Sequence, residues 1–309
     1  MATRTWLPLV LAWWLAIGCS RPDTGSSATG AADNQQFDVY VVNYPLRFLA
    51  TRIGGDEVAV HFPVPKDADP AYWSPDTDTL AGYQAADLIL LNGAGYAGWT
   101  QSVSLPESKL VDTSATAADR YIELDGALTH SHGPGGEHAH GGTAFTTWLD
   151  LTVAIAQADT ICAELVRRCP EHEAQFKQRH SQLVQELAEL DSTLAKLAAG
   201  NSNQPLLFSH PVYQYFIERY ELNGRSVHWE PHETPSAEQW AELDGILEVH
   251  PAKWMLWEAE PAPETAEQLQ QRGIRSVVVQ PCGNAPDQGD FLAVMRQNIE
   301  NIRPVFEEP

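Results

Sequence analysis

Basic residues are scarce in this chain of 309 residues, and their scarcity excludes two classes of partner. The sequence has 19 Lys and Arg against 41 Asp and Glu, which gives a formal net charge of -22. Such a charge repels nucleic acid and anionic membrane surfaces and attracts a cationic ligand. The same acidic excess is also compatible with a device for solubility alone.

Cysteine is rare as well, with four residues in the whole chain. If Cys19 is modified as argued below, three remain, so at least one thiol is left unpaired. Cys162 and Cys169 are seven residues apart in a predicted helix, where their Cα atoms are about 10 Å apart, beyond the ~7 Å limit for a disulfide. They can pair only if the helix unwinds before Pro170, so the sequence leaves their pairing open.

The apolar run near the N-terminus is too short for a membrane-spanning helix. It extends from Trp6 to Ile17 after Arg4, whereas a span needs ~20 residues, but it fits the core of a secretory signal. Gly18-Cys19-Ser20 follows and resembles the lipoprotein cleavage site of bacteria, with Ala16 where Leu is usual. We therefore expect a signal peptide over residues 1–19 with Cys19 lipidated, or a plain signal cut nearby. Residues 20–36 predict a flexible tether.

One long amphipathic helix is predicted from Glu173 to Ala199. Its apolar residues recur at helical spacing; they are Phe176, Leu183, Leu187, Leu190, Leu194 and Leu197. At ~1.5 Å per residue the helix is about 40 Å long, and Gly200 supplies a stop signal. A helix of this length usually joins two bodies. We therefore expect residues 166–204 to link a lobe over 37–165 to a lobe over 205–309.

Strands and helices alternate on both sides of that helix. The predicted strands are residues 37–43, 58–62, 87–92 and 109–111 in the first lobe, and 206–209, 226–230, 253–257 and 276–280 in the second. This alternation predicts an α/β fold of two lobes, each a parallel sheet flanked by helices. Ligands bind at the carboxyl ends of such strands, so a cleft is predicted between the lobes. Its expected lining is the loops after Phe62, Asn92, Ser209, Glu230, Trp257 and Gln280.

A histidine-rich segment covers residues 130–142. It contains four of the eleven histidines of the chain, namely His130, His132, His138 and His140. The remaining residues are small or polar and cannot pack a core, so the segment predicts a mobile exposed loop. Imidazoles on such a loop would bind Zn²⁺ loosely and exchange it quickly. The alternative is a merely hydrophilic linker.

Several short motifs follow one another from residue 37 to the end. They are Ala86–Trp99 with its Ala-Asp, apolar run, Asn-Gly and Trp, then Trp148-Leu149-Asp150, Ser209-His210 with Tyr213–Phe216, Glu233–Ser236, Trp257-Glu258 and Met295–Asn298. Their order and spacing resemble the zinc and manganese solute-binding proteins of bacterial ABC importers. The resemblance implies a protein without enzymatic activity that captures a divalent metal outside the cytoplasm, zinc first and manganese or another metal second. It further implies delivery to an ABC permease, a lipid anchor in the membrane, a periplasmic or cell-surface location and a monomer.

The metal ligands of that family correspond here to Ala71, Thr146, His210 and Gln280. His210 matches, and the resemblance implies that it binds the metal. Further donors are predicted on the cleft loops. His228, Glu230 and His232 alternate, which places them on one face of a strand that Pro231 interrupts. The other candidates are Glu258, Gln280, Cys282 and His140, which lies six residues before Thr146.

Two other functions stay open. Aromatic residues fall on or near the predicted cleft loops, namely Tyr72, Trp73, Trp99, Trp229 and Trp257. They either pack the lobes or admit a metal chelate or a small organic molecule. A metallohydrolase built on His228, Glu230 and His232 is disfavoured, because no nucleophile motif or acid and base pair stands near them.

Overall fold

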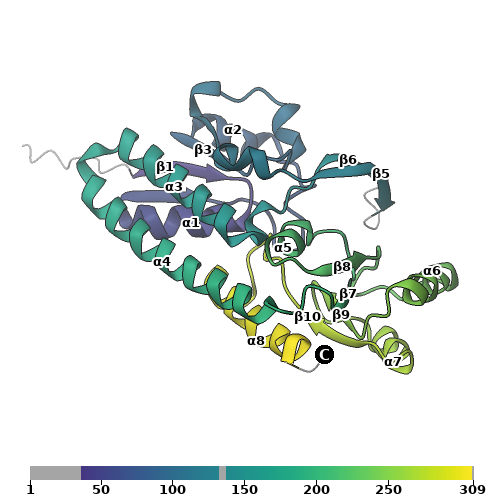
Figure 1. Ribbon diagram of the computed structural model, residues 1–309. Helices are drawn as coiled ribbons and strands as arrows, with labels where there is room; N and C mark the ends of the chain where they lie inside the picture. Colours follow the sequence, from purple (N-terminus) through teal and green to yellow (C-terminus); the bar gives the residue numbers. More distant parts are fainter. Residues whose placement is uncertain (1–35, 132–136, 308–309) are drawn as a thin grey trace, which may run out of the picture. The chain divides into compact units, whose positions relative to one another are not determined.

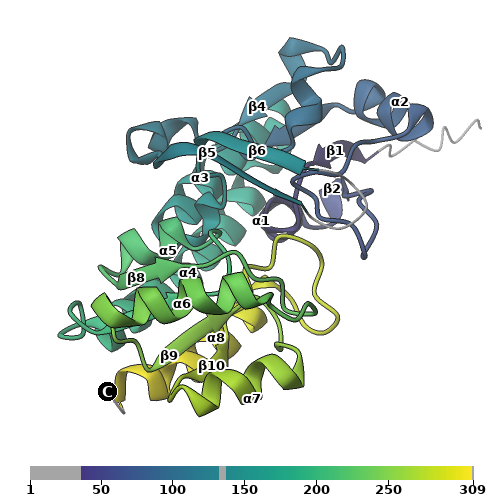
Figure 2. The ribbon, with the colours of Figure 1, turned by 90° about the vertical axis from the view of Figure 1, so that its right-hand side faces the viewer.

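Two parallel four-stranded sheets dominate the computed structural model, which describes residues 36–131 and 137–307 and, within 125–141, the backbone alone. Figures 1 and 2 show the two sheets with helices around them. The two-lobed α/β fold predicted from the strand and helix alternation is therefore confirmed. The predicted signal peptide with Cys19 lies outside the described residues, as do His132 and the tether up to residue 35.

The first lobe is built on a sheet of order β2-β1-β3-β4. Its strands and helices are β1 Phe37–Val41, β2 Val58–His61, β3 Leu88–Leu91, β4 Leu110–Asp112, α1 Tyr44–Gly54 and α2 Thr77–Ala85. Leu88, Ile89 and Leu90 are all fully buried, because helices cover both faces of a parallel sheet. The side chain of Asn43 caps α1 by accepting the amide of Leu46 at 3.0 Å.

The second lobe repeats this design with the sheet order β10-β9-β7-β8. Its elements are β7 Pro205–Phe208, β8 Asn223–Ser226, β9 Trp254–Trp257, β10 Arg275–Val278, α5 Gln214–Arg219, α6 Ala237–Val249 and α7 Pro263–Gln271. Buried residues of α6 and α7 pack with Trp229 and Trp257 in a separate small cluster. These two tryptophans, predicted near the cleft, therefore serve packing.

Three long helices complete the fold: α3 Leu151–Arg168, α4 Glu173–Ala198 and α8 Phe291–Glu307. The predicted long helix is confirmed as α4, which packs against α1, α3 and α8. It buries Leu183, Leu187 and Leu194, as their spacing predicts.

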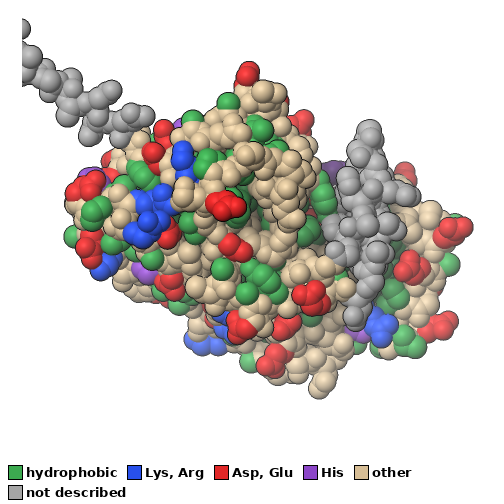
Figure 3. Space-filling model, turned by 90° about the horizontal axis from the view of Figure 1, so that it is seen from above, with side chains coloured by type: hydrophobic (Ala, Val, Ile, Leu, Met, Phe, Trp, Pro, Cys, Tyr) green, Lys and Arg blue, Asp and Glu red, His purple; other side chains and the backbone are tan. Residues whose placement is uncertain are grey.

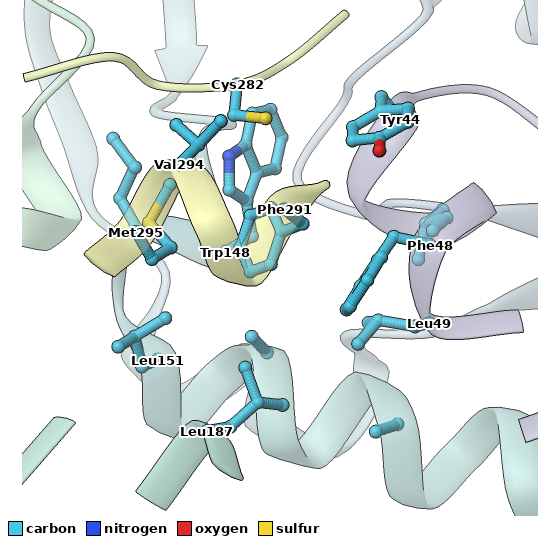
Figure 4. Close-up of a cluster of buried hydrophobic side chains, with 14 of the residues drawn as sticks. Tyr44, Phe48, Leu49, Trp148, Leu151, Leu187, Cys282, Phe291, Val294 and Met295 are labelled. Carbon is cyan, nitrogen blue, oxygen red and sulfur yellow. The ribbon is translucent and has the colours of Figure 1, made fainter. Parts of the chain in front are cut away.

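A single hydrophobic core runs through both lobes. It includes Val39 and Leu90 of the first sheet and Leu206 and Leu256 of the second. Figure 4 shows the part of this core in which Phe48, Leu187 and Phe291 approach one another from α1, α4 and α8. Because close-packed interiors transmit strain rather than absorb it, this shared core couples the lobes stiffly.

The described backbone of the histidine-rich segment corrects one expectation. Strands β5 Glu123–Ser131 and β6 Glu137–Thr143 form a two-stranded antiparallel ribbon rather than an irregular loop. His130 lies opposite His138, and Leu128 lies opposite His140. A polar sequence can form such a ribbon because the chain folds back on itself and pairs its own backbone groups.

Helices long and apolar enough to cross a bilayer are absent from the part of the chain that the structure describes.

Candidate metal site

A cavity of about 1090 Å³ lies between the two lobes, and loops of both lobes line it. The first lobe contributes Asp69, Tyr72 and Phe145, among others, and the second contributes His210 and Glu258. The lining includes residues from the predicted loops that follow β2, β3, β7, β8, β9 and β10. The sequence thus located the cleft, because the carboxyl ends of parallel strands meet at one edge of each sheet.

Backbone hydrogen bonds continue beyond the ends of the strands of the second sheet. Ser209 N donates to Leu256 O at 2.8 Å, Trp229 N to Ser209 O at 2.7 Å, and Val279 N to Trp257 O at 2.8 Å. The residue after each bonded position is polar and lines the cavity. In the order of the strands β8, β7, β9 and β10, these residues form a donor row of Glu230, His210, Glu258 and Gln280.

His210 lies between two carboxylates within this donor row. Its Nδ1 is 3.3 Å from Glu258 Oε1, and its Nε2 is 3.7 Å from Glu230 Oε1. The imidazole is 8% exposed, whereas the two carboxylates are about one third exposed and face the cavity. Each ring nitrogen therefore has its own acidic neighbour, one from the loop after β8 and one from the loop after β9.

The predicted strand through His228, Glu230 and His232 is wrong. Strand β8 ends at Ser226, so these three residues follow it in a loop and do not share one strand face. The ring of His228 meets the ring of His210 edge to face at 6.1 Å between centroids. Burial lowers the pKa of His228, and His210 lowers it further. His232 is exposed at the cavity lining. Pro231 and the capping box at the start of α6 follow the strand instead of extending it.

Gln280 occupies the end of the donor row and is held there by a residue of α8. Gln280 N donates to Asn298 Oδ1 at 2.9 Å, and Asn298 Nδ2 donates to Gln280 O at 2.8 Å. Asn298 is 5% exposed on the buried side of α8. The sequence signal for this role is an amide among the apolar positions Met295, Ile299 and Ile302, and the motif Met295–Asn298 did not by itself indicate its contact with Gln280.

The first lobe carries no imidazole at the two family positions. Ala71 has no donor in its side chain, and its backbone N–H is bound by Asp69 Oδ1 at 2.9 Å. The hydroxyl of Thr146 donates to Val212 O at 2.5 Å, which ties the first lobe to the loop after His210. The side chain at position 146 therefore joins the two lobes by a hydrogen bond. Whether His140 reaches this region stays a prediction, since its side chain is not described.

An aromatic wall faces the donor row from the first lobe. It consists of the half-buried rings of Tyr72 and Phe145 with Tyr96 behind them, and the centroids of successive rings are 6.3 and 5.3 Å apart. Burial raises the pKa of Tyr72, and the charges of Asp69, Glu230 and Glu258 raise it further. Acidic groups from both lobes therefore surround this phenol.

Cys282 lines the cavity two residues after Gln280, with its backbone in the left-handed region at φ 60°. Burial raises the pKa of its thiol to about 12, and Asp290 adds to this. Without a metal the thiol is therefore protonated near neutral pH, and the role of Cys282 as a metal donor stays a prediction. Cys162, Cys169 and Cys282 are all free and buried.

The loop after Cys282 connects the lobes beside the cavity, a role that the sequence analysis missed. Asn284 Nδ2 donates to Pro65 O at 2.8 Å and to Ala68 O at 2.7 Å. Nearby, Tyr44 N donates to Gly283 O at 3.0 Å and Trp148 Nε1 to Pro281 O at 2.8 Å. The Trp of the Trp-Leu-Asp motif thus holds this loop against the first lobe.

Within the described residues, His, Cys, Asp and Glu side chains do not gather in a group of three or more that could hold an ion as placed. The donors closest to each other are His210 with Glu258 and His210 with Glu230. The other predicted donors are spread along the donor row or lie beside it.

Comparisons with known proteins agree with this architecture. Residues 39–305 match the family model ZnuA, described as zinc-uptake complex component A, periplasmic. The high-affinity zinc uptake system protein ZnuA of Bacillus subtilis is 23% identical over 90% of this chain and 91% of its own length. The manganese ABC transporter substrate-binding lipoprotein scaA of Streptococcus gordonii is 24% identical over 72% of this chain and 71% of its own.

A solved structure shows the same fold. The Zn(II)-bound ZnuA-like domain of Streptococcus pneumoniae AdcA superposes with a TM-score of 0.74 at 17% identity, covering 88% of this chain and 99% of that domain. The family match covers most of the chain, and the two-lobed fold with its linking helix agrees with it. This chain belongs to the ZnuA family of substrate-binding proteins of metal ABC importers.

Proposed function

We propose that this protein captures a divalent transition metal, zinc first and manganese or another metal second, in the cleft between its lobes. The observation that carries the proposal is the imidazole of His210 between Glu258 at 3.3 Å and Glu230 at 3.7 Å. Imidazole nitrogen and carboxylate oxygen are common ligands of these metals. The cavity gives the ion an entry path between the lobes.

The two carboxylates have different roles in this proposal. Two donors that each lie about 2.1 Å from one tetrahedral ion are about 3.4 Å from each other, which is close to the separation of His210 Nδ1 and Glu258 Oε1. Glu258 therefore shares the ion with His210, and Glu230 orients the ring from its other nitrogen. His228, His232 and Gln280 flank this pair and complete the candidate set.

The family supplies the expected partners. Relatives named as metal ABC transporter substrate-binding lipoproteins support delivery of the ion to an ABC permease. The N-terminal sequence supports a signal peptide over 1–19, lipidation of Cys19 and a tether over 20–36. These features support a protein that is anchored to the membrane outside the cytoplasm, and we further propose that it acts as a monomer. Membership of a transport family also favours this role over a metallohydrolase.

The histidine-bearing ribbon is the second metal-collecting element. Its register pairs His130 with His138, and residues 138 and 140 fall on the same face because strand positions alternate. Together with His132, these histidines would bind metal with lower affinity than the cleft and exchange it quickly. They would raise the local concentration of metal beside the cavity.

Calorimetric titration with zinc tests both assignments. His210→Ala should abolish the high-affinity event, because it removes the imidazole that two carboxylates surround. The matched control is His180→Ala, which removes an imidazole from α4 that pairs with Asp159 and does not line the cavity. That control should keep the high-affinity event.

Removal of residues 130–140 should lower the zinc stoichiometry and leave the high-affinity event in place. Tight binding that survives in His210→Ala would overturn the assignment of the cleft. Tight binding that disappears with the ribbon would move the main site to the ribbon.

A further inference from the structure

The donor row is too wide to close around one bare ion. Neighbouring strands of a sheet lie about 4.8 Å apart, so the four strands that carry Glu230, His210, Glu258 and Gln280 span about 14 Å. The two nitrogens of His210 face different carboxylates. An ion on one nitrogen is therefore within reach of only one of these two carboxylates. An ion bound there would need further donors besides this nitrogen and this carboxylate.

The cavity is also larger than a hydrated ion requires. Its volume of about 1090 Å³ lies just above the ~300–1,000 Å³ range of sites for small organic molecules. The wall opposite the donor row is aromatic, with Tyr72 and Phe145 half-buried at the cavity lining. Flat rings suit the face of a small planar ligand.

The charge of the lining restricts which ligand can accompany the ion. Carboxylates of Asp67, Asp69, Glu230, Glu258 and Asp287 line the cavity, and among its described lining residues Lys66 alone is a Lys or Arg. Elsewhere acidic side chains lie scattered over the face in Figure 3. A complex that carries net negative charge is therefore repelled, and one that keeps positive charge is attracted.

Resting on the proposed function, we propose that the cleft captures the metal as a cationic complex with a small nitrogen-donor molecule of the imidazole or amine class. In this complex His210 and one carboxylate bind the ion from the second lobe. The small molecule fills the open coordination positions and lies against Tyr72 and Phe145. The acidic lining then selects against metal complexes of citrate and other polycarboxylates.

Native mass spectrometry and zinc titrations, compared at equal free zinc concentrations, test this proposal. The probes are zinc chloride alone, zinc with L-histidine, whose one-to-one complex keeps a positive charge, and zinc with citrate, whose complex is negative. We expect one equivalent each of zinc and histidine on the protein and at least tenfold tighter apparent zinc binding with histidine. Citrate should act only as a competitor.

Variants of Tyr72 separate this subsite from the ion site. Tyr72→Ala should reduce the gain from histidine about fivefold or more and leave the binding of zinc alone unchanged, whereas Tyr72→Phe keeps the ring and should keep the gain. If Tyr72→Ala melts at a lower temperature, Phe145→Leu provides the second test of the aromatic wall. If the ring had only a structural role, its loss would weaken the binding of zinc alone and of zinc with histidine alike.

Two results overturn the proposal. In the first, histidine strips zinc from the protein as citrate does, or the saturated protein carries zinc alone; the proposed function then survives and the small-molecule subsite fails. In the second, the protein binds neither zinc nor its histidine complex, and both proposals fail together.

Discussion

At the scale of single residues, Asp191 shows how a buried charge joins three parts of the chain. It lies on α4 and binds Arg219 of α5 through two contacts of 2.8 and 2.5 Å. Tyr220 adds a hydrogen bond of 3.2 Å to the same carboxylate. Arg219 also lies 3.7 Å from Asp150, which caps α3 in the first lobe. Asp191 thus joins α4 to α5, and through Arg219 it connects α5 to the start of α3.

Asp191→Asn should lower the free energy of unfolding by about 2 kcal/mol, because it removes the partner of a partly buried guanidinium. Chemical denaturation followed by circular dichroism measures this value. Asp244→Asn is the matched control, since Asp244 pairs with Arg272 at the surface and is 54% exposed. That change should cost less than about 1 kcal/mol. Equal effects of the two substitutions would contradict the role of Asp191.

At the scale of elements, the end of α3 is held by an ionic cluster. Glu164 accepts hydrogen bonds from Arg167 and Arg168, and Arg168 also donates to Asp87 O and Ser108 O of the first lobe. The hydrogen bond from Arg167, assisted by the one from Arg168, lowers the pKa of Glu164 below its ordinary value near 4.5. Ionised Glu164 thus supports the contact of α3 with the first sheet.

The lowered pKa predicts a pH dependence of stability. The contribution of Glu164 is fully present above its unfolded value near 4.5 and is lost as the pH falls through the lower folded value. Wild type should therefore exceed Glu164→Gln in unfolding free energy at pH 7, and the difference should shrink below about pH 4.5. Urea titrations of both proteins between pH 3 and 7 measure it. A constant difference over that range would refute the assignment.

At the scale of the whole described chain, two seams beside the cavity fix the distance between the lobes. On one side Asn284 and Trp148 join the loop after β10 to the first lobe. On the other side Thr146 binds Val212 O, and Tyr215 donates its hydroxyl to Ala144 O at 2.9 Å. The common core adds to these seams. Metal release should therefore proceed by small rearrangement of loops.

Asn284→Ala should loosen one seam, because it removes the amide that donates to Pro65 O, Lys66 O and Ala68 O in the loop after β2. Amide hydrogen exchange over residues 63–73 should become faster, and zinc should pass to an added chelator several times sooner. Asn223→Ala is the control, since Asn223 donates one exposed bond of 3.3 Å to Asn203 O within the second lobe. Unchanged exchange in Asn284→Ala would show that the shared core alone sets the lobe spacing.

Local sequence patterns were sufficient to predict the alternation of strands and helices, the long helix α4 and the edge at which the cleft lies. These follow from local patterns, since apolar spacing sets the period of a helix and a polar residue after a buried strand faces the edge. His210 and Glu258 were located in this way. The extent of β8 was misjudged, because Val227 and Trp229 keep the apolar pattern and hydrogen bonds to Phe208 O and Ser209 O, whereas the regular strand ends at Ser226.

Which donors are neighbours depends on the order of the strands in the folded sheet. The order β10-β9-β7-β8 brings Glu258 and Glu230 to opposite nitrogens of His210, although these residues are far apart in the sequence. The roles of Thr146 and Asn284 also depend on the folded structure, because each donates a hydrogen bond to the other lobe. Strand order and lobe contact depend on long-range packing, and no local pattern of residues encodes them.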